Sequence, residues 1–286
     1  MQIVTDRGMD LALKQLDGLD IHIVPLRIIL DGKTYTSGED LQPDEFYRML
    51  SATESFPTTT MPSVGDFTAI YQKLAEKDPE ILSIHLSSGL SGTINSARAA
   101  AALVPEANVT IVDSMTLSAP FGWQVEAAAH AVKAGWPKER ILEMIKKLQE
   151  NTQGIYTLAS MKYLIHGGRI SHIKGLLASL LNIKPIIGVE KEHGTYYQLG
   201  QEMTLKRSIL KMVDVVAGFY KPGSILRVQL LHGDNPEGVE ILRERLKQVF
   251  EVVWEPVTAV APVLGAHTGP SVVGLAVGPA SIFEHF

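Results

Sequence analysis

The sequence contains no cysteine, which excludes disulfide bonds, thiolate metal sites and cysteine nucleophiles and fits a reducing compartment. It also has no excess of positive charge, because 26 basic residues face 31 acidic ones for a net charge of -5. Such a chain has no overall field to attract nucleic acid, so an anionic ligand must be held by a local site. No run approaches the ~20 apolar residues of a membrane span, and the N-terminus lacks the apolar core of a signal peptide. We therefore expect a cytoplasmic protein with no transmembrane segment and no nucleic-acid partner.

Several catalytic and cofactor motifs are missing as well. The Gly-Lys-Ser/Thr of a Walker phosphate loop does not occur, and neither does His-Glu-x-x-His. The histidines are scattered, and His166 and His172 lack the spacing that places two ligands on one helix face. We expect neither a metal site nor a cofactor.

What the chain does have is a regular alternation of strand-like and helix-like segments. Its 286 residues, 45% of them hydrophobic, are enough for one large domain or two ordinary ones. The alternation predicts a mainly parallel sheet covered by helices on both faces. Polar residues and a glycine interrupt it between Asn151 and Gly154. We predict an α/β protein with two domains: residues 1–153 with a mainly parallel sheet flanked by helices, and residues 154–286 as a smaller α/β domain with a mixed sheet.

In the first half, local signals set most of the expected elements. Asp31-Gly32 predicts a tight hairpin turn, Pro43 begins a helix, and Ser63 with Asp66 forms a capping box for the next helix. The expected strands are 2–5, 22–30, 33–36, 80–86 and 109–112, and the expected helices are 9–16, 43–50, 63–74, 94–102, 120–134 and 137–150.

The second half continues the alternation with more strands. The expected strands are 155–158, 183–189, 195–199, 225–231, 252–257 and 272–277, and the expected helices are a short one ending at 166, then 173–181, 204–217 and 236–249. The glycine-flanked stretch from Gly265 to Pro270 is expected to be a loop between two apolar strands.

The most informative stretch of the chain is the Ser/Gly loop from Leu86 to Thr93, which reads Leu-Ser-Ser-Gly-Leu-Ser-Gly-Thr. It follows an apolar strand and precedes an alanine-rich helix, so it lies where open α/β sheets bind ligands. Gly89 and Gly92 allow a tight turn and a close approach to a ligand, and the helix start offers unpaired N–H groups. A loop whose hydroxyls simply cap the helix explains the same residues.

Three further segments concentrate polar groups at expected loop positions: Thr58 to Ser63, Gly167-Gly168-Arg169, and the Gly265–Pro270 stretch with His267. Taken singly, His267 and Arg169 also fit ordinary capping and packing roles. A nucleophile elbow requires Gly-x-Ser-x-Gly, whereas Gly89 to Thr93 ends in threonine. An acyl hydrolase or esterase that uses Ser91 and His267 remains the alternative function.

Jointly, these segments resemble the signatures of DegV-family fatty-acid-binding proteins. The matching stretches are Thr59-Thr60-Met61-Pro62-Ser63, Ser87 to Thr93, Gly167 to Ser171 with Leu181 to Pro185, and His267-Thr268-Gly269-Pro270. They occur in the family's order and span nearly the whole chain. The resemblance implies two α/β domains with a buried long-chain fatty acid near their loops.

The resemblance also implies roles for particular residues. Thr59 and Ser91 would hydrogen-bond the fatty acid carboxylate, with Thr60 and Ser88 nearby, and Arg169 and His267 would complete the polar end of the site. Several family members are the binding subunit of a bacterial fatty acid kinase. They present the acyl carboxylate to a separate ATP-dependent subunit that makes acyl phosphate for phospholipid synthesis. The implied partners are therefore a long-chain fatty acid, a kinase catalytic subunit and, transiently, a membrane surface.

Two positions depart from the family pattern. The family usually has Asp-Ser-Thr near the first strand, where this chain has Thr5-Asp6-Arg7-Gly8. The family also tends to carry an arginine after the second-domain hairpin, a residue that would meet the kinase. Here Met203 is close to that position, and Lys206-Arg207 follow a few residues later.

Overall fold

The computed structural model describes residues 1–172 and 183–284. Within them, the first part of the chain forms a parallel sheet in the order β2 (Ile21–Val24), β1 (Gln2–Asp6), β6 (Glu80–His85) and β7 (Asn108–Asp113). The predicted parallel sheet is confirmed. Because its strands are parallel, the loops that follow β1, β6 and β7 meet at one edge.

The second sheet is mixed, as predicted. Its path along the described residues runs β10 (Tyr196–Glu202), β9 (Lys184–Val189), β8 (Gln153–Thr157), β14 (Val273–Pro279), β11 (Ile225–His232) and β12 (Glu251–Trp254), with β13 (Thr258–Ala259) also paired to β11. β12 and β13 run parallel to β11, and the other pairs are antiparallel. The predicted helix at 173–181 lies outside the described residues.

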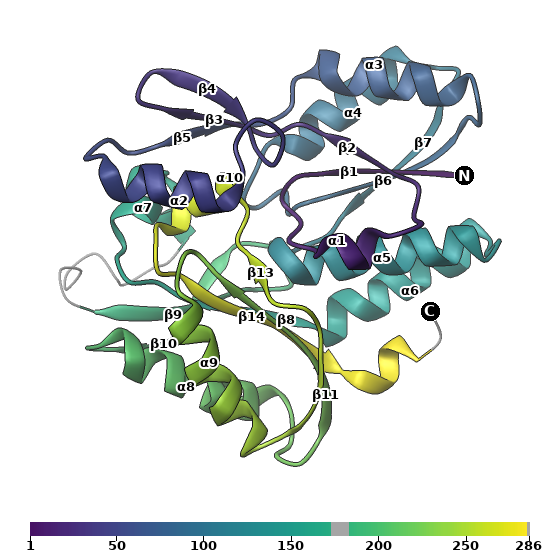
Figure 1. The fold of residues 1–286 in the computed structure, drawn as a ribbon. Coiled ribbons are helices and arrows are strands. Elements are labelled where there is room, and N and C mark those ends of the chain that lie inside the picture. Colours follow the sequence, from purple (N-terminus) through teal and green to yellow (C-terminus); the bar gives the residue numbers. More distant parts are fainter. Residues whose placement is uncertain (173–182, 285–286) are drawn as a thin grey trace.

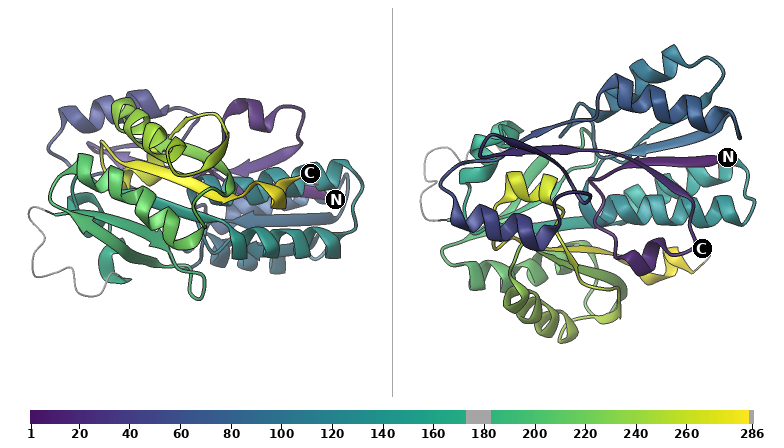
Figure 2. Two further views of the ribbon diagram at one scale, coloured as in Figure 1. Left: turned by 90° about the horizontal axis from the view of Figure 1, so that it is seen from below. Right: turned by 45° about the horizontal axis from the view of Figure 1, so that its top comes forward.

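Helices cover the two sheets and also separate them (Figures 1 and 2). The outer helices on the first sheet are α3 (Val64–Ala75) and α4 (Thr93–Leu103), those on the second are α8 (Leu205–Phe219) and α9 (Pro236–Lys247), and between the sheets lie α5 (Ser118–Lys133) and α6 (Lys138–Asn151). α5 contacts β1 of the first sheet and β8 and β14 of the second. The two sheets therefore share one helical layer.

A third group of elements sits beside this stack, at the left of Figure 1. It consists of the antiparallel sheet β4 (Lys33–Thr36), β3 (Arg27–Leu30), β5 (Thr58–Thr60), the helices α2 (Pro43–Ala52), α7 (Lys162–His166) and α10 (Pro262–Thr268), and the 3-10 helix η1 (Arg169–His172). α10 contacts α2, α7, β3 and β5, so it packs residues of the C-terminal part against those of the N-terminal part.

Local signals placed several of these elements correctly. Asp31 and Gly32 both have positive φ, of 50° and 76°, as the tight β3–β4 hairpin requires. The Ser63 hydroxyl accepts from the N–H of Asp66, and the Asp66 carboxylate accepts from the N–H of Ser63, so the capping box at the start of α3 is confirmed.

The single strand expected over 22–30 was wrong. The chain instead divides at Pro25 into β2 of the parallel sheet and β3 of the antiparallel one. Proline has no N–H to donate to a ladder, so it marks the position where the chain leaves one sheet and enters another.

The helix expected over 9–16 is reduced to α1 (Leu13–Leu16), because Asp10 is used in long-range contacts. Its buried carboxylate accepts hydrogen bonds from the Ser118 hydroxyl and, at 2.8 Å, from the N–H of Ala261. The Asp10 carbonyl accepts from the Gln229 amide at 3.0 Å. These contacts hold the segment in an irregular path between the two halves of the chain.

The largest hydrophobic cluster crosses the expected domain boundary. It includes Phe46, Phe121 and Trp123 from the first half and Leu231 and Ala276 from the second. The chain passes from the first sheet to the second at Gln153, where β8 begins, but the hydrophobic core continues across this point. The division into domains 1–153 and 154–286 therefore stays a prediction. Within the described ranges, no helix is long and apolar enough to cross a bilayer.

Candidate ligand site

A cavity of about 390 Å³ lies where β5, the loop after β6, η1 and α10 come together. Its lining combines polar and apolar side chains, and the apolar ones, apart from Met61, are the more deeply buried. The lining consists of Leu26, Thr59, Thr60, Met61, Leu86, Leu90, Ser91, Gly92, Leu117, Arg169, Tyr196, Val263, Leu264 and His267. None of these described lining residues is acidic. The cavity therefore suits a ligand with an anionic head and an apolar body.

Thr59 and His267 form the contact that joins the two halves of the chain at this cavity. Thr59 lies on β5, opposite Ile28 of β3, and its side chain is half-buried between the exposed Thr58 and Thr60. Its Oγ1 is 2.8 Å from Nε2 of His267, which is 208 residues further along the chain.

His267 lies in the last turn of α10, so the loop expected at Gly265 to Pro270 was wrong for its first part. Pro262 starts this helix, and Gly269 ends it with φ 74°. Burial, reinforced by the nearby Arg169 guanidinium, lowers the pKa of His267 to about 4. The imidazole is therefore uncharged at neutral pH.

The other imidazole nitrogen, Nδ1, is buried and has no hydrogen-bond partner in the described part of the chain. It faces Gly167, where a Cβ atom would lie only 2.1 Å from Nδ1. Glycine at position 167 is thus required for the ring to pack here.

Arg169 supplies the cationic group of the cavity lining. Its Nη1 donates to the Gly167 carbonyl at 2.6 Å and its Nε to the Leu90 carbonyl at 3.4 Å. These two hydrogen bonds orient the side chain from η1 toward the Ser/Gly loop, residues 86–93. Within residues 1–172 and 183–284, no carboxylate pairs with Arg169. A buried ligand anion would meet a guanidinium with donors to spare.

Ser91 is the hydroxyl that the Ser/Gly loop contributes to the cavity. Its Oγ lies 2.9 Å from Oγ1 of Thr93 and accepts from the Thr93 N–H at 3.3 Å, at the first residue of α4. The same hydroxyl therefore accepts from the first N–H of α4 and also lines the cavity, although the N-cap residue of α4 is Gly92.

Ser88 and Gly89 lie elsewhere in the loop. Ser88 is exposed and outside the cavity lining, and its N–H faces the Asp113 carboxylate at 3.3 Å. A Cβ on Gly89 would be 2.3 Å from the carbonyl oxygen of His193, so this glycine permits a close approach to the β9–β10 turn. The Ser87 hydroxyl donates to the Gly194 carbonyl at 2.8 Å in the same contact.

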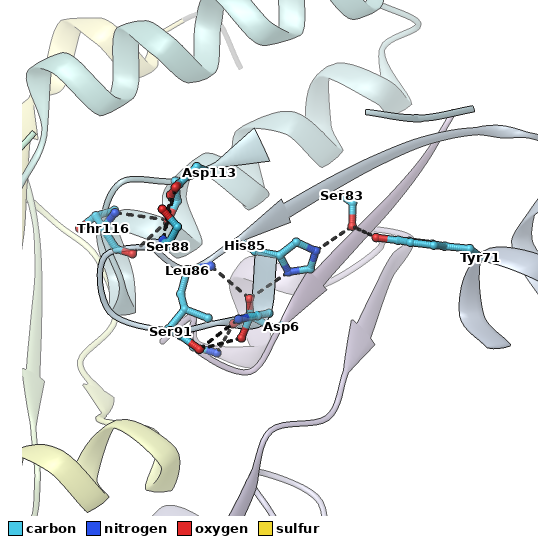
Figure 3. A network of polar contacts seen from close by, with 12 residues as sticks. Asp6, Tyr71, Ser83, His85, Leu86, Ser88, Ser91, Asp113 and Thr116 are labelled. Atoms are coloured by element: carbon cyan, nitrogen blue, oxygen red, sulfur yellow. Dashed lines mark hydrogen bonds and ion pairs between the residues drawn. The ribbon is translucent and has the colours of Figure 1, made fainter. Parts of the chain in front are cut away.

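A buried polar chain anchors the start of the Ser/Gly loop (Figure 3). Asp6 accepts from the N–H of Leu86 at 3.1 Å and lies 2.9 Å from Nδ1 of His85. Nε2 of His85 lies 2.7 Å from the Ser83 hydroxyl, which in turn is 2.8 Å from the Tyr71 hydroxyl. This Asp-His-Ser arrangement resembles a catalytic relay, but its members are fully buried and none lines the cavity. It fixes the ends of β1 and β6, and Asp6 belongs to the Thr5–Gly8 stretch in which the sequence departs from the family pattern.

The geometry gives no support to a hydrolase that uses Ser91 and His267. Nε2 of His267 contacts Thr59, whereas Ser91 contacts Thr93. The described cavity residues also offer no carboxylate that would orient the imidazole as a general base.

Sequence reasoning missed the apolar part of the cavity. Leu90 is in the Ser/Gly loop itself, and Tyr196, Leu117 and Leu264 lie in three further segments. Tyr196 is the first residue of β10, and Leu264 is three residues before His267 on α10. Helical spacing would have found Leu264 if 262–268 had been recognised as a helix.

Comparison with known protein families shows to which family the chain belongs. Residues 1–280 match the family model described as "Uncharacterised protein, DegV family". The chain belongs to the DegV family. A DegV domain-containing protein of Staphylococcus aureus strain MRSA252 is 34% identical over 275 residues, which cover 96% of this chain and 97% of that protein.

DegV-family structures with the same fold have been reported with fatty acids. A structure on fatty acid binding of a DegV family protein from Thermus thermophilus has a TM-score of 0.86 and 28% identity, and covers 97% of this chain and 99% of that one. A stearic-acid-binding protein from Eubacterium ventriosum has a TM-score of 0.84 and 27% identity, with 98% of both chains covered. The fold expected from the DegV resemblance is confirmed.

Proposed function

We propose that this protein binds one long-chain fatty acid in the cavity and is a lipid-binding protein rather than a catalyst. The observation that carries the proposal is that one cavity combines hydroxyl groups and a guanidinium with buried apolar side chains. Thr59, Ser91 and Arg169 hold the carboxylate, His267 orients the Thr59 hydroxyl, and the exposed Thr60 lies beside them. Fatty acid binding by the Thermus and Eubacterium relatives supports the proposal.

The uncharged state of His267 gives Thr59 its role. When Nε2–H of His267 donates to Oγ1 of Thr59, the hydroxyl proton of Thr59 is free to point at a carboxylate oxygen. Arg169 then attracts the carboxylate by its positive charge, and the hydroxyl hydrogen bonds fix the orientation of the carboxylate. A carboxylate held by several such donors avoids the high cost of burying an unpaired charge.

The acyl chain provides most of the binding free energy. Each methylene that leaves water contributes about 0.8 kcal/mol, and each charged hydrogen bond about 1.5–3 kcal/mol. A tail that fills the part of the cavity lined by Leu26, Leu90 and Val263 therefore outweighs the head group in affinity. The head group determines which way round the ligand lies.

The first experiment identifies the ligand. Native mass spectrometry of the purified chain, followed by solvent extraction and lipid analysis, should find one fatty acid per protein. A chain that carries no acyl ligand and also fails to bind added fatty acid would contradict the proposal.

Two substitutions then test the carboxylate site. Thr59→Val and Ser91→Ala each remove one charge-assisted hydrogen bond, which corresponds to about a tenfold to hundredfold weaker affinity. Thr58→Val is the matched control, because Thr58 neighbours Thr59 on β5, is exposed and is absent from the cavity lining. Unchanged affinity in both Thr59→Val and Ser91→Ala would show that the carboxylate lies elsewhere.

We further propose that the protein presents the carboxylate to a separate ATP-dependent kinase subunit for acyl phosphate formation. The polar end of the cavity is its exposed end, where Thr60 and Met61 reach the surface. Met203, Lys206 and Arg207 are also exposed, at the start of α8, and offer a second surface for docking. The test is the transfer of labelled phosphate from ATP to bound fatty acid when the cognate kinase subunit is added. Transfer that is equally fast with free fatty acid would contradict a presenting role.

A further inference from the structure

A second, much smaller space adjoins the buried apolar lining of the cavity. Its volume is about 10 Å³, and it shares Leu117, Tyr196 and Leu264 with the main cavity. Since these three side chains line both spaces, they lie where the two spaces adjoin, and we call them the wall. Beyond the wall, the small space is bounded by the apolar Ile187, Val260 and Val272. Its remaining lining residues are polar: Ser118, Tyr156 and Thr268.

All the side chains that line the inner space are buried. Leu117 and Tyr196 are each 4% exposed and Leu264 is 7% exposed. Ile187, Val260 and Val272 are buried to the same degree or more. A volume of about 10 Å³ has room for about one water molecule and therefore none for a length of acyl chain.

We infer that Leu117, Tyr196 and Leu264 stop the acyl chain and so set the longest fatty acid that binds with full affinity. The inference rests on the proposed function, because it concerns the tail of the same ligand. An acyl chain whose carboxylate is bound by the polar side chains meets this wall at the far side of the main cavity. Additional carbons must then displace close-packed side chains, which opposes the gain from burying them.

The experiment measures affinity against chain length. Delipidated protein is titrated with saturated fatty acids from decanoic to eicosanoic acid in competition with a fluorescent fatty acid. Affinity should rise about fourfold for each added methylene until the chain reaches the wall, and then stop rising. The chain length at this break is the quantity to compare between variants.

Leu264→Ala is the decisive variant, since it removes most of one wall side chain and joins the two spaces. It should move the break to longer chains. Leu264→Val is a milder alternative if the alanine variant does not fold. Leu26→Ala is the control, because Leu26 is equally buried but lines only the main cavity. It should weaken every fatty acid and leave the break in place.

A double substitution tests the route through the wall. Val260→Leu fills the inner space, so it should return the break of Leu264→Ala toward the wild-type length and have no effect on the break by itself. An unchanged break in folded Leu264→Ala, or an equal shift in Leu26→Ala, would overturn the inference while leaving fatty acid binding intact. Absence of binding at every chain length in the wild type would instead overturn the proposed function.

Discussion

Residues brought together from distant parts of the chain define the polar end of the site. Thr59 and His267 are 208 positions apart, and their contact at 2.8 Å depends on the packing of α10 against β5. His267 is kept uncharged by burial and by Arg169, so the site holds one fixed positive charge rather than two. Arg169 thereby carries the electrostatic attraction, and His267 acts as a neutral hydrogen-bonding group.

The lowered pKa of His267 makes the stability of the ligand-free protein depend on pH. In the unfolded chain the pKa of His267 is the ordinary histidine value of 6.5, whereas in the folded protein it is about 4. The free energy of unfolding is therefore unaffected by His267 above pH 6.5. It decreases as the pH falls toward 4, because the unfolded state then binds a proton at His267 and the folded state does not. This difference in pKa corresponds to a decrease of about 3 kcal/mol in the free energy of unfolding.

Urea unfolding of wild type and His267→Gln, at pH values across this window, measures the effect. Glutamine keeps a donor for Thr59 but does not titrate, so the variant should lose less stability on acidification than the wild type. Parallel pH profiles for the two proteins would show that His267 is not held neutral by the fold.

At the scale of elements, the close contact between the Ser/Gly loop and the β9–β10 turn positions the site. Gly89 packs against the backbone of His193 and Gly194, and Ser87 donates to the Gly194 carbonyl. Gly89 was expected to make room for a ligand, but it makes room for another part of the chain.

Gly89→Ala should therefore destabilise the fold. Its Cβ would lie 2.3 Å from a backbone oxygen that cannot rotate away, and such overpacking costs about 1–3 kcal/mol. Gly218→Ala in α8 is the control, because its Cβ would meet nothing within 4 Å. Replacing that helical glycine should stabilise the protein by up to about 1 kcal/mol. Equal unfolding midpoints for Gly89→Ala and wild type would contradict the tight contact.

At the scale of the whole molecule, two sheets share the helices between them and most of one hydrophobic core. α5 contacts both sheets, and α10 carries residues of the C-terminal part into the group formed by β3, β5 and α2 (Figure 1). The cavity lies within this shared region, which explains why its lining comes from both halves of the sequence.

We expect the two halves to unfold together. Trp123 and Trp136 report on the helical layer, and Trp254 on the edge of the second sheet. Urea unfolding followed by circular dichroism and by the fluorescence of wild type and Trp254→Phe should give coincident midpoints. Two separate transitions would instead support independent domains that divide near residue 153.

Much of the fold could be predicted because it depends on short-range chemistry. The capping box at Ser63 and Asp66 and the hairpin at Asp31-Gly32 involve neighbours in sequence. The alternation of segments indicated a mainly parallel sheet covered by helices. The polar residues of the candidate site also stand out in the sequence, since hydroxyls beside glycines are conspicuous between apolar runs. Thr59, Thr60, Ser91, Arg169 and His267 do line one cavity, whereas Ser88 does not.

The apolar half of the site was decided only by the tertiary structure. In the sequence, Leu117 and Leu264 are indistinguishable from the leucines that fill the core, because every one of them is simply apolar and buried. Which of them border a space depends on how α10, β10 and the Ser/Gly loop pack against one another. A sequence pattern specifies which side chains avoid water, but only the packing of whole elements specifies where they leave room for a ligand.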